Sequence, residues 1–130
     1  MSLRIKGETL IPDEVTRLLG APPTTSVKKG DVKLLSQDGR ETIARQGMWS
    51  LSAEKRTPGD LDGQVTEILG KLTHDIEIWA QLGPRFKMDL FCGLFMRESN
   101  EGAVLSAKAM LALGERGIEL GFDIYDGSKP

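Results

Sequence analysis

FKMDLFCGLFM, residues 86–96, alternates apolar side chains with other residues at every second position. Successive side chains of a β-strand point to opposite faces of its sheet, so this period of two predicts a strand. One face carries Phe86, Met88, Leu90, Cys92, Leu94 and Met96. The other carries Lys87, Asp89, Phe91, Gly93 and Phe95. We therefore predict a central strand that is buried on its first face and partly covered on its second.

Strand patterns also occur on both sides of this segment. Leu3 and Ile5 alternate with charged residues, which predicts a short first strand. The dipeptide Asp38-Gly39 is a hairpin turn signal, and it predicts strands at 32–35 and 41–51 with a bulge near Gly47. The segment IELGFDIY (118–125) predicts a last strand. Its inward side chains are Ile118, Leu120, Phe122 and Ile124, and its outward ones are Glu119, Gly121, Asp123 and Tyr125.

Apolar residues at helical spacing predict helices between these strands. We place them at 12–19, at 61–72, within 75–83 and between Ser106 and Gly117. Segment 75–83 also fits a strand, and we favour a short helix there. The predicted helix ends carry capping signals, which are Pro12 in a first turn, Thr57 or Asp60 and Ser106 at N-termini, and Gly20 and Gly117 at C-termini.

The predicted order is strand, helix, two-stranded hairpin, helix, strand, helix, strand. Its first six elements follow the split βαβ order of ferredoxin-like domains, in which an antiparallel sheet carries helices on one face. We therefore predict an α+β fold, a ferredoxin-like βαββαβ sandwich extended by a C-terminal helix and strand. The length of 130 residues favours one domain over residues 1–130. The sheet face away from the helices would stay partly open, and Asp89, Glu119, Asp123 and Tyr125 would point there.

The composition argues against several classes of protein. The net charge is −2, with 17 basic and 19 acidic residues spread along the chain, so there is no basic field for a nucleic acid. No apolar run reaches the ~20 residues that span a bilayer, and the start MSLRIKGE lacks the apolar core of a signal peptide. The single cysteine cannot form an intramolecular disulfide, which agrees with a reducing compartment. We expect a cytoplasmic protein that binds neither nucleic acid nor membrane.

The stretch LLGAPPTTSVKKGD (18–31) deserves a test as a phosphate-binding loop. A Walker-type loop needs G-x-x-x-x-G-K-[ST], but here the lysines precede the glycine and two prolines remove amide donors. We interpret the stretch as a rigid connection from the first helix to the hairpin, with Gly30 in a turn. Lys28, Lys29 and Asp31 remain candidate binding residues, because they would lie at the mouth of the sheet.

Residues with metal or nucleophile chemistry are sparse. His74 is the only histidine, and the only cysteine, Cys92, lies far from it in the predicted strand, so they give no pair at metal-ligand spacing. We interpret His74 as a solvated residue at a helix end and Cys92 as a small core residue. The elbow G-x-S-x-G of serine hydrolases does not occur. We predict no catalytic residue, no metal site and no cofactor.

Large aromatic residues on strands are the sharper candidates. Trp49 and Tyr125 either fill the core or form a recognition surface, as large aromatics on strands do. Asp123 lies beside Tyr125 on the same predicted face, and we include it among the candidate binding residues. Asp89, Glu119 and Asp123 could also act as paired acid and base, although solubilising an exposed sheet face is the simpler role.

Several of these segments together resemble a known family. The order and spacing of LGAPPTTSVKKGD, GMWSLS, DLDGQVTEILGKL and LGERGIELGFDIYDG resemble the small bacterial family called domain of unknown function 4279. The resemblance extends over nearly the whole chain, and it implies no established activity, cofactor or substrate. Such small bacterial proteins are also similar to stand-alone immunity or accessory proteins, which act by binding another protein.

Three functional hypotheses follow. The first is a non-enzymatic domain that binds a protein partner or self-associates through its sheet face or the loop before the hairpin. The second is a small-ligand or sensor module with a pocket between Trp49 and Tyr125. The third is an enzyme that uses Asp89, Glu119 and Asp123.

Overall fold

The computed structural model describes residues 1–35, 39–54, 60–96 and 102–126. Strands and helices alternate along most of the chain. In order they are β1 (Ser2–Gly7), α1 (Pro12–Leu19), β2 (Thr25–Val27), β3 (Val32–Leu35), β4 (Arg40–Ile43), β5 (Gly47–Ser52), α2 (Leu61–Gly70), α3 (Ile76–Leu82), β6 (Lys87–Met96), α4 (Ala107–Glu115) and β7 (Glu119–Asp126).

Five strands form the main sheet in the order β2-β5-β1-β6-β7, and β3 pairs with β4 in a separate two-stranded sheet. The pairs β2–β5, β5–β1 and β1–β6 are antiparallel, and β6–β7 is parallel. The segment 86–96 therefore becomes an interior strand, as its pattern predicts. The α+β prediction is confirmed, and the more specific ferredoxin-like assignment stays a prediction.

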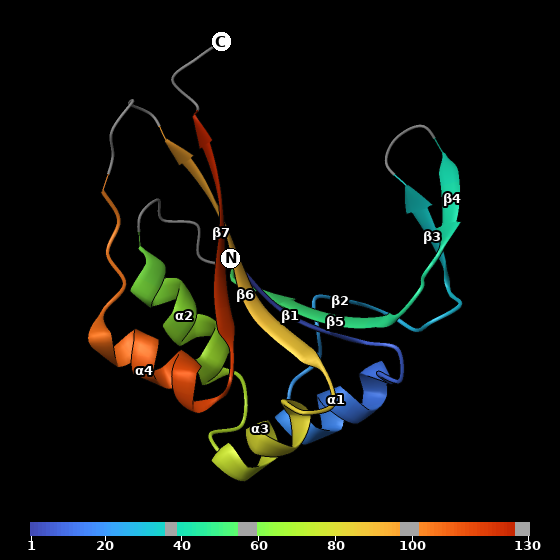
Figure 1. Cartoon of the computed structure of the whole chain (residues 1–130), viewed down its shortest axis with the longest axis horizontal. Coiled ribbons are helices and arrows are strands. Elements are labelled where there is room, and N and C mark those ends of the chain that lie inside the picture. The colour runs from blue at the N-terminus through green and yellow to red at the C-terminus, as the bar shows by residue number, and fades with distance from the viewer. Residues whose placement is uncertain (36–38, 55–59, 97–101, 127–130) are drawn as a thin grey trace.

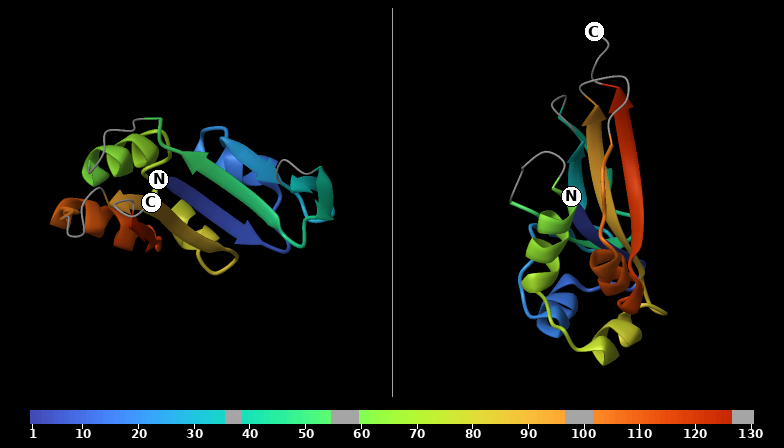
Figure 2. Two further views of the ribbon diagram at one scale, coloured as in Figure 1. Left: turned by 90° about the horizontal axis from the view of Figure 1, so that it is seen from above. Right: turned by 90° about the vertical axis from the view of Figure 1, so that its left-hand side faces the viewer.

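The helices cover one face of the sheet and leave the other uncovered in the described part of the chain (Figures 1 and 2). On the uncovered side the β6–β7 pair and the β3–β4 hairpin rise like two walls, and the sheet between them is concave (Figure 1). We call this concave surface the open face. We call the opposite surface, which carries the helices, the helix face.

The core fills the helix face. Leu3 and Ile5 of β1 are fully buried, and Trp49 of β5 pairs directly beside Ile5. The indole N–H of Trp49 donates to Thr16 Oγ1 of α1 at 3.0 Å, so the buried ring leaves no unsatisfied polar atom. On the other side of β1, Met88 of β6 lies opposite Ile5 and is also buried. This layer of apolar side chains fixes which face of every strand meets the helices.

The helix ends agree with their sequence signals. Pro12 lies in the first turn of α1, and Gly20 closes the helix with a φ of 86° that disfavours other residues. The side chains of Asp60 and Ser106 accept backbone N–H groups at the starts of α2 and α4. The alternative cap, Thr57, lies outside the described residues. The favoured helix at 75–83 is confirmed as α3.

The predicted hairpin needs correction. Residues 41–51 are not one bulged strand, since β4 ends at Ile43 and β5 begins at Gly47. The outer neighbour of β5 in the main sheet, on the side away from β1, is β2, residues 25–27, which we expected to be a connector. The sequence TSV is too short and too polar to show a period of two, and only pairing with β5 makes it a strand. The β3–β4 hairpin is therefore an insertion outside the main sheet.

The predicted burial of β7 also needs correction. Phe122 and Ile124 lie on the helix face as expected, yet they are 45% and 58% exposed. The helix α4 covers the start of β7, next to the buried Ile118, and no other described element covers the later residues on this face.

Gly47 shows how closely β5 approaches the loop before α1. A Cβ at this position would lie 2.3 Å from the carbonyl oxygen of Leu10, a backbone atom that cannot move aside. We expect Gly47→Ala to lower the free energy of unfolding by about 1–3 kcal/mol, as overpacking does. Urea denaturation measures the change. Gly93→Ala is the control, because a Cβ there meets nothing within 4 Å; equal destabilisation by both changes would contradict the steric argument.

Candidate functional site

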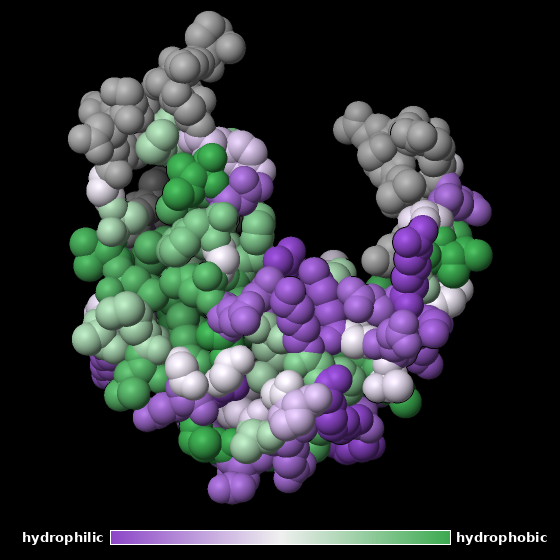
Figure 3. Space-filling model, viewed as in Figure 1, coloured by the Kyte–Doolittle hydropathy of each residue, from purple (hydrophilic) through white to green (hydrophobic). Residues whose placement is uncertain are grey.

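The open face combines a charged floor with an aromatic wall. The floor is formed by Arg4 and Lys6 of β1, and by Lys87 and Asp89 of β6, which lie opposite them in register. In the space-filling model coloured by hydropathy, hydrophilic residues line the hollow between the two walls and apolar residues lie along the β6–β7 wall (Figure 3). A surface of this composition can contact both charged and apolar groups of a bound molecule.

Arg4 and Asp89 organise one end of the floor. The guanidinium donates twice to the carboxylate, from Nε to Oδ1 at 2.9 Å and from Nη2 to Oδ2 at 2.7 Å. Arg4 also lies over the ring of Phe91, 4.6 Å from its centroid. The hydrogen bond from Arg4 lowers the pKa of Asp89 below its ordinary value, although partial burial acts in the opposite direction. Asp89 is therefore held as a carboxylate near neutral pH, where it neither donates nor accepts a proton.

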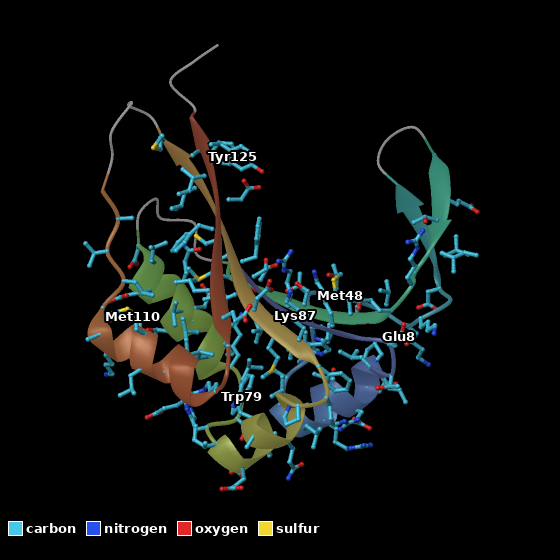
Figure 4. All side chains as sticks on the ribbon, viewed as in Figure 1. Glu8, Met48, Trp79, Lys87, Met110 and Tyr125 are labelled. Atoms are coloured by element: carbon cyan, nitrogen blue, oxygen red, sulfur yellow. The ribbon has the colours of Figure 1, made fainter. Side chains whose placement is uncertain are left out.

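Lys6 and Lys87 occupy the other end of the floor. They lie directly opposite each other across β1 and β6, and like charges in this position destabilise a sheet. Neither ammonium has a carboxylate within ion-pair distance in the described parts of the chain. Figure 4 shows Lys87 on the floor of the open face, with Met48 of β5 nearby. Two adjacent cations thus face the hollow without an ion pair among the described residues, although both act at longer range on the Asp89 carboxylate and lower its pKa.

Phe95 and Tyr125 form the aromatic wall. Their rings stack at 4.8 Å between centroids with an interplanar angle of 17°, on neighbouring positions of β6 and β7. Phe95 is 72% exposed and Tyr125 45% exposed, which leaves an unusually large apolar area in water. The phenol O–H donates to Asp123 Oδ2, and this bond raises the pKa of Tyr125 above its ordinary value. Tyr125 stays a neutral aromatic side chain that is held in place at both ends.

Trp49 does not join this surface. It points to the helix face and is fully buried, whereas Tyr125 and Asp123 point to the open face. The sheet separates the two aromatics, so no pocket can lie between them as the small-ligand hypothesis requires. Trp49 could reach a ligand only if the core opened.

The three predicted loop residues belong to a turn between β2 and β3. The backbone N–H of Lys28 donates to Asp31 Oδ2 at 2.8 Å, and Gly30 has a φ of 95°. Asp31 thus stabilises the turn with its side chain, and the prediction that Gly30 serves a turn is confirmed. The side chains of Lys28 and Lys29 are exposed beside the base of the β3–β4 hairpin. Their role in binding stays a prediction.

Two carboxylates of the enzyme hypothesis are neighbours, and the third lies apart from them. Asp89 and Glu119 lie directly opposite each other on β6 and β7, and both belong to the open face. Asp123 lies four residues from Glu119 along β7, about 13 Å away, and accepts the phenol O–H of Tyr125. No group of three or more His, Cys, Asp or Glu side chains that could hold a metal occurs in the described ranges. Because Asp89 is bound to Arg4, it is held ionised, and acid–base chemistry by Asp89 and Glu119 stays a hypothesis.

The whole-chain comparison now decides the family. The model of the family described as Domain of unknown function (DUF4279) matches residues 1–127. The protein belongs to the DUF4279 family. The sequence resemblance is thereby confirmed, and it assigns no role to any residue. No curated protein and no solved structure is significantly similar to the chain. Within the described residues of this DUF4279 chain, no helix is long and apolar enough to cross a membrane.

A second concave site of the DUF4279 chain lies between α2 and α4. Arg116 is 8% exposed there, donates to the carbonyl of Ala112 at 2.9 Å and lies 3.3 Å from His74 Nδ1. The pocket measures about 290 Å³, and its lining includes Asp62, which accepts the N–H of Ser106. These bonds lie at the ends of the two helices, and the buried Nε of Arg116 has no hydrogen-bond partner among the described residues. His74 is exposed, as predicted, and Cys92 is buried, which raises the pKa of its thiol.

The sequence interpretation missed the most informative residues of the open face. Lys6, Lys87 and Phe95 were not among the candidates, although the period of two places Lys87 and Phe95 on the same side of 86–96. What the sequence does not contain is the register between β1 and β6. Only this register shows that Lys6 and Lys87 are neighbours and that Arg4 meets Asp89.

The Arg4–Asp89 pair predicts a pH dependence of stability. Because the pKa of Asp89 is lower in the folded state, its ionisation favours folding above the unfolded value of about 4. This contribution is lost as the pH falls from there through the lower folded-state pKa. We expect Asp89→Asn to lower the free energy of unfolding near neutral pH by on the order of 1 kcal/mol.

Urea denaturation at a series of pH values tests this expectation. The difference between wild type and Asp89→Asn should shrink as the pH falls below about 4. Glu115→Gln is the control, since Glu115 is exposed and lies on α4, away from the pair. A difference that stays constant from neutral to acidic pH would show that the effect of Asp89→Asn is not electrostatic.

Proposed function

We propose that this protein is a non-enzymatic protein-binding domain and that its partner occupies the open face. The observation that carries the proposal is the stacked pair of exposed aromatics, Phe95 and Tyr125, at the edge of a concave, charged sheet face. Small bacterial immunity and accessory proteins act in this way, by covering part of another protein.

The aromatic wall suits the centre of an interface. Large aromatic side chains contribute most of the binding energy in many protein interfaces, because they bury much area at a small entropic cost. Phe95 and Tyr125 are already ordered by stacking and by the bond to Asp123, so a partner would pay little to fix them. In water the same pair exposes apolar area without a compensating contact.

The floor indicates the chemistry of the partner. Arg4 is neutralised by Asp89, whereas Lys6 and Lys87 leave two positive charges facing the hollow. A projecting segment with an acidic side chain over the lysines and an apolar one against Phe95 would match both features. We therefore expect a protein partner that presents Asp or Glu beside an apolar residue.

The small-ligand hypothesis comes second. Its predicted place between Trp49 and Tyr125 is divided by the sheet, and the pocket between α2 and α4 is the better location for it. The Arg116 and Asp62 side chains of that pocket already bond within the chain, to Ala112 and to Ser106. The open face, by contrast, presents Lys6 and Lys87 without an ion pair among the described residues beside the exposed rings of Phe95 and Tyr125, and this favours protein binding.

Replacing the aromatic wall tests the proposal. We expect the wild-type chain to retain a specific partner at a fixed stoichiometry from an extract of its native cells. The double variant Phe95→Ser, Tyr125→Ser should bind the same purified partner at least about tenfold more weakly, because it removes the proposed anchors. Isothermal titration calorimetry with the isolated partner measures the loss.

Ile76→Ser is the matched control. Ile76 is an exposed apolar residue, 39% accessible, at the start of α3 on the helix side of the sheet. It should leave the affinity unchanged. Absence of any specific partner, or equal binding by the wild type and the double variant, would refute a binding site at the aromatic wall.

The lysine pair gives a second test, with opposite effects on stability and binding. Lys6→Gln and Lys87→Gln each remove a like-charge contact, so we expect the free energy of unfolding to rise by about 0.2–1 kcal/mol. The same changes should weaken partner binding by about three- to tenfold and reduce its dependence on salt. Lys108→Gln, an exposed change on α4, should alter neither. Higher stability with undiminished affinity would remove the lysines from the site.

A further inference from the structure

The free edge of β7 is a second surface without a partner. β7 is the last strand of the main sheet and pairs only with β6 among the described residues. The other edge, β2, has three residues, whereas β7 has eight. The backbone N–H and C=O groups on a long outer edge can pair with a strand of another chain.

Apolar side chains accompany this edge. Phe122 and Ile124 are 45% and 58% exposed on the helix face of β7, and Met110 and Leu111 are 54% and 61% exposed on the neighbouring α4. The space-filling model shows apolar surface over α4 and β7, on the left-hand side of the view (Figures 1 and 3). Figure 4 shows Met110 on the outer side of α4. Leu120, Phe122 and Ile124, which lie on the helix face of β7, are all uncharged, so none of these three side chains would keep another strand away.

The helix α4 covers only part of the length of β7. Its first half lies under α4, and Ile118 just before it is buried, whereas Phe122 and Ile124 have no helix above them in the part of the chain that the structure describes. If the β7 strand of a second copy paired antiparallel with this one, the first half of the second strand and the α4 of that copy would lie beside the uncovered half of the first strand. The surface is therefore complementary to itself under a two-fold rotation.

We propose that two copies of this chain associate through antiparallel pairing of their β7 strands, with the two-fold axis at Phe122. In this register Leu120 of each copy lies opposite Ile124 of the other, and Phe122 lies opposite itself, which brings apolar groups together on the helix face. On the open face Glu119 meets Tyr125, and Gly121 meets Asp123. No like charges are opposed.

Neighbouring registers are less favourable. An axis at Asp123 would oppose the two Asp123 carboxylates, and an axis at Gly121 would oppose Glu119 and Asp123. The axis at Phe122 is also the one that gives nearly full overlap of the eight residues without a like-charge pair. The two main sheets would join into one, with both open faces on the same side and both still accessible.

The oligomeric state of the full-length chain tests the proposal. Sedimentation equilibrium at micromolar concentrations should give twice the chain mass of 14.2 kDa for the wild type. Ile124→Lys and Leu111→Lys replace exposed side chains and should shift the protein to monomer at the same concentrations. Ile76→Lys, the same change on α3, should remain a dimer. A monomeric wild type, or a dimer that survives Ile124→Lys, would overturn the proposal.

Cross-linking tests the register without relying on dissociation. Phe122→Cys should form a disulfide-linked dimer under mild oxidation, because the self-paired Cα atoms would lie within disulfide range, about 5.5 Å apart. Ile124→Cys alone should not, since its two copies would lie about 14 Å apart. A mixture of Ile124→Cys and Leu120→Cys chains should form the cross-link. The native Cys92 is buried and provides the background in each case.

The single variant Phe95→Ser separates this proposal from the proposed function, because Phe95 lies on β6 and not on the pairing edge. Phe95→Ser should remain a dimer while it binds the partner more weakly. Ile124→Lys should become a monomer while it keeps the open face and its partner. If instead Phe95→Ser is monomeric and Ile124→Lys stays dimeric, the open face is the self-association surface and the β7 register is wrong.

Discussion

The complete burial of Leu3 and Ile5 on β1 is the constraint on which the other features depend. β1 lies in the middle of the main sheet and pairs on both sides, so the face on which its two apolar residues lie becomes the helix face of β5 and β6 as well. A shift of one residue in either pairing would move a whole set of side chains to the wrong face. The same registers place Arg4 against Asp89 and Lys6 against Lys87 on the open face. Core and candidate site are therefore determined together, by the same hydrogen-bond ladders.

The sequence predicts those elements whose pattern is both long and local. Residues 86–96 alternate over a length that no other structure explains, and the capping residues Asp60, Ser106 and Gly20 mark helix ends through contacts within a few residues. The strand at 25–27 has no such pattern. Backbone hydrogen bonds to β5 hold it in the sheet, and its side chains show no apolar alternation. The hairpin signal at Asp38-Gly39 predicted two adjacent strands, and it could not show that they leave the main sheet.

The candidate site was less predictable than the fold, because it depends on which strands become neighbours. Phe95 and Tyr125 are thirty positions apart in the sequence, and their stacking follows only from the parallel β6–β7 register. The exposure of Phe122 and Ile124 depends on where α4 ends its cover, which an alternating pattern cannot reveal. For Trp49 the sequence left a core role and a recognition role open, and the bond to Thr16 together with its burial places the ring in the core.

The β3–β4 hairpin has a consequence for how this protein can change over generations. Two backbone bonds close its base by joining its two arms, from Gly30 N–H to the Ala44 carbonyl and from Ala44 N–H to the Asp31 carbonyl. Neither β3 nor β4 takes part in the five-stranded ladder. Substitutions or length changes between these bonds therefore alter one wall of the open face and leave the core intact. The fold separates the part that must stay constant from a part that is free to diversify.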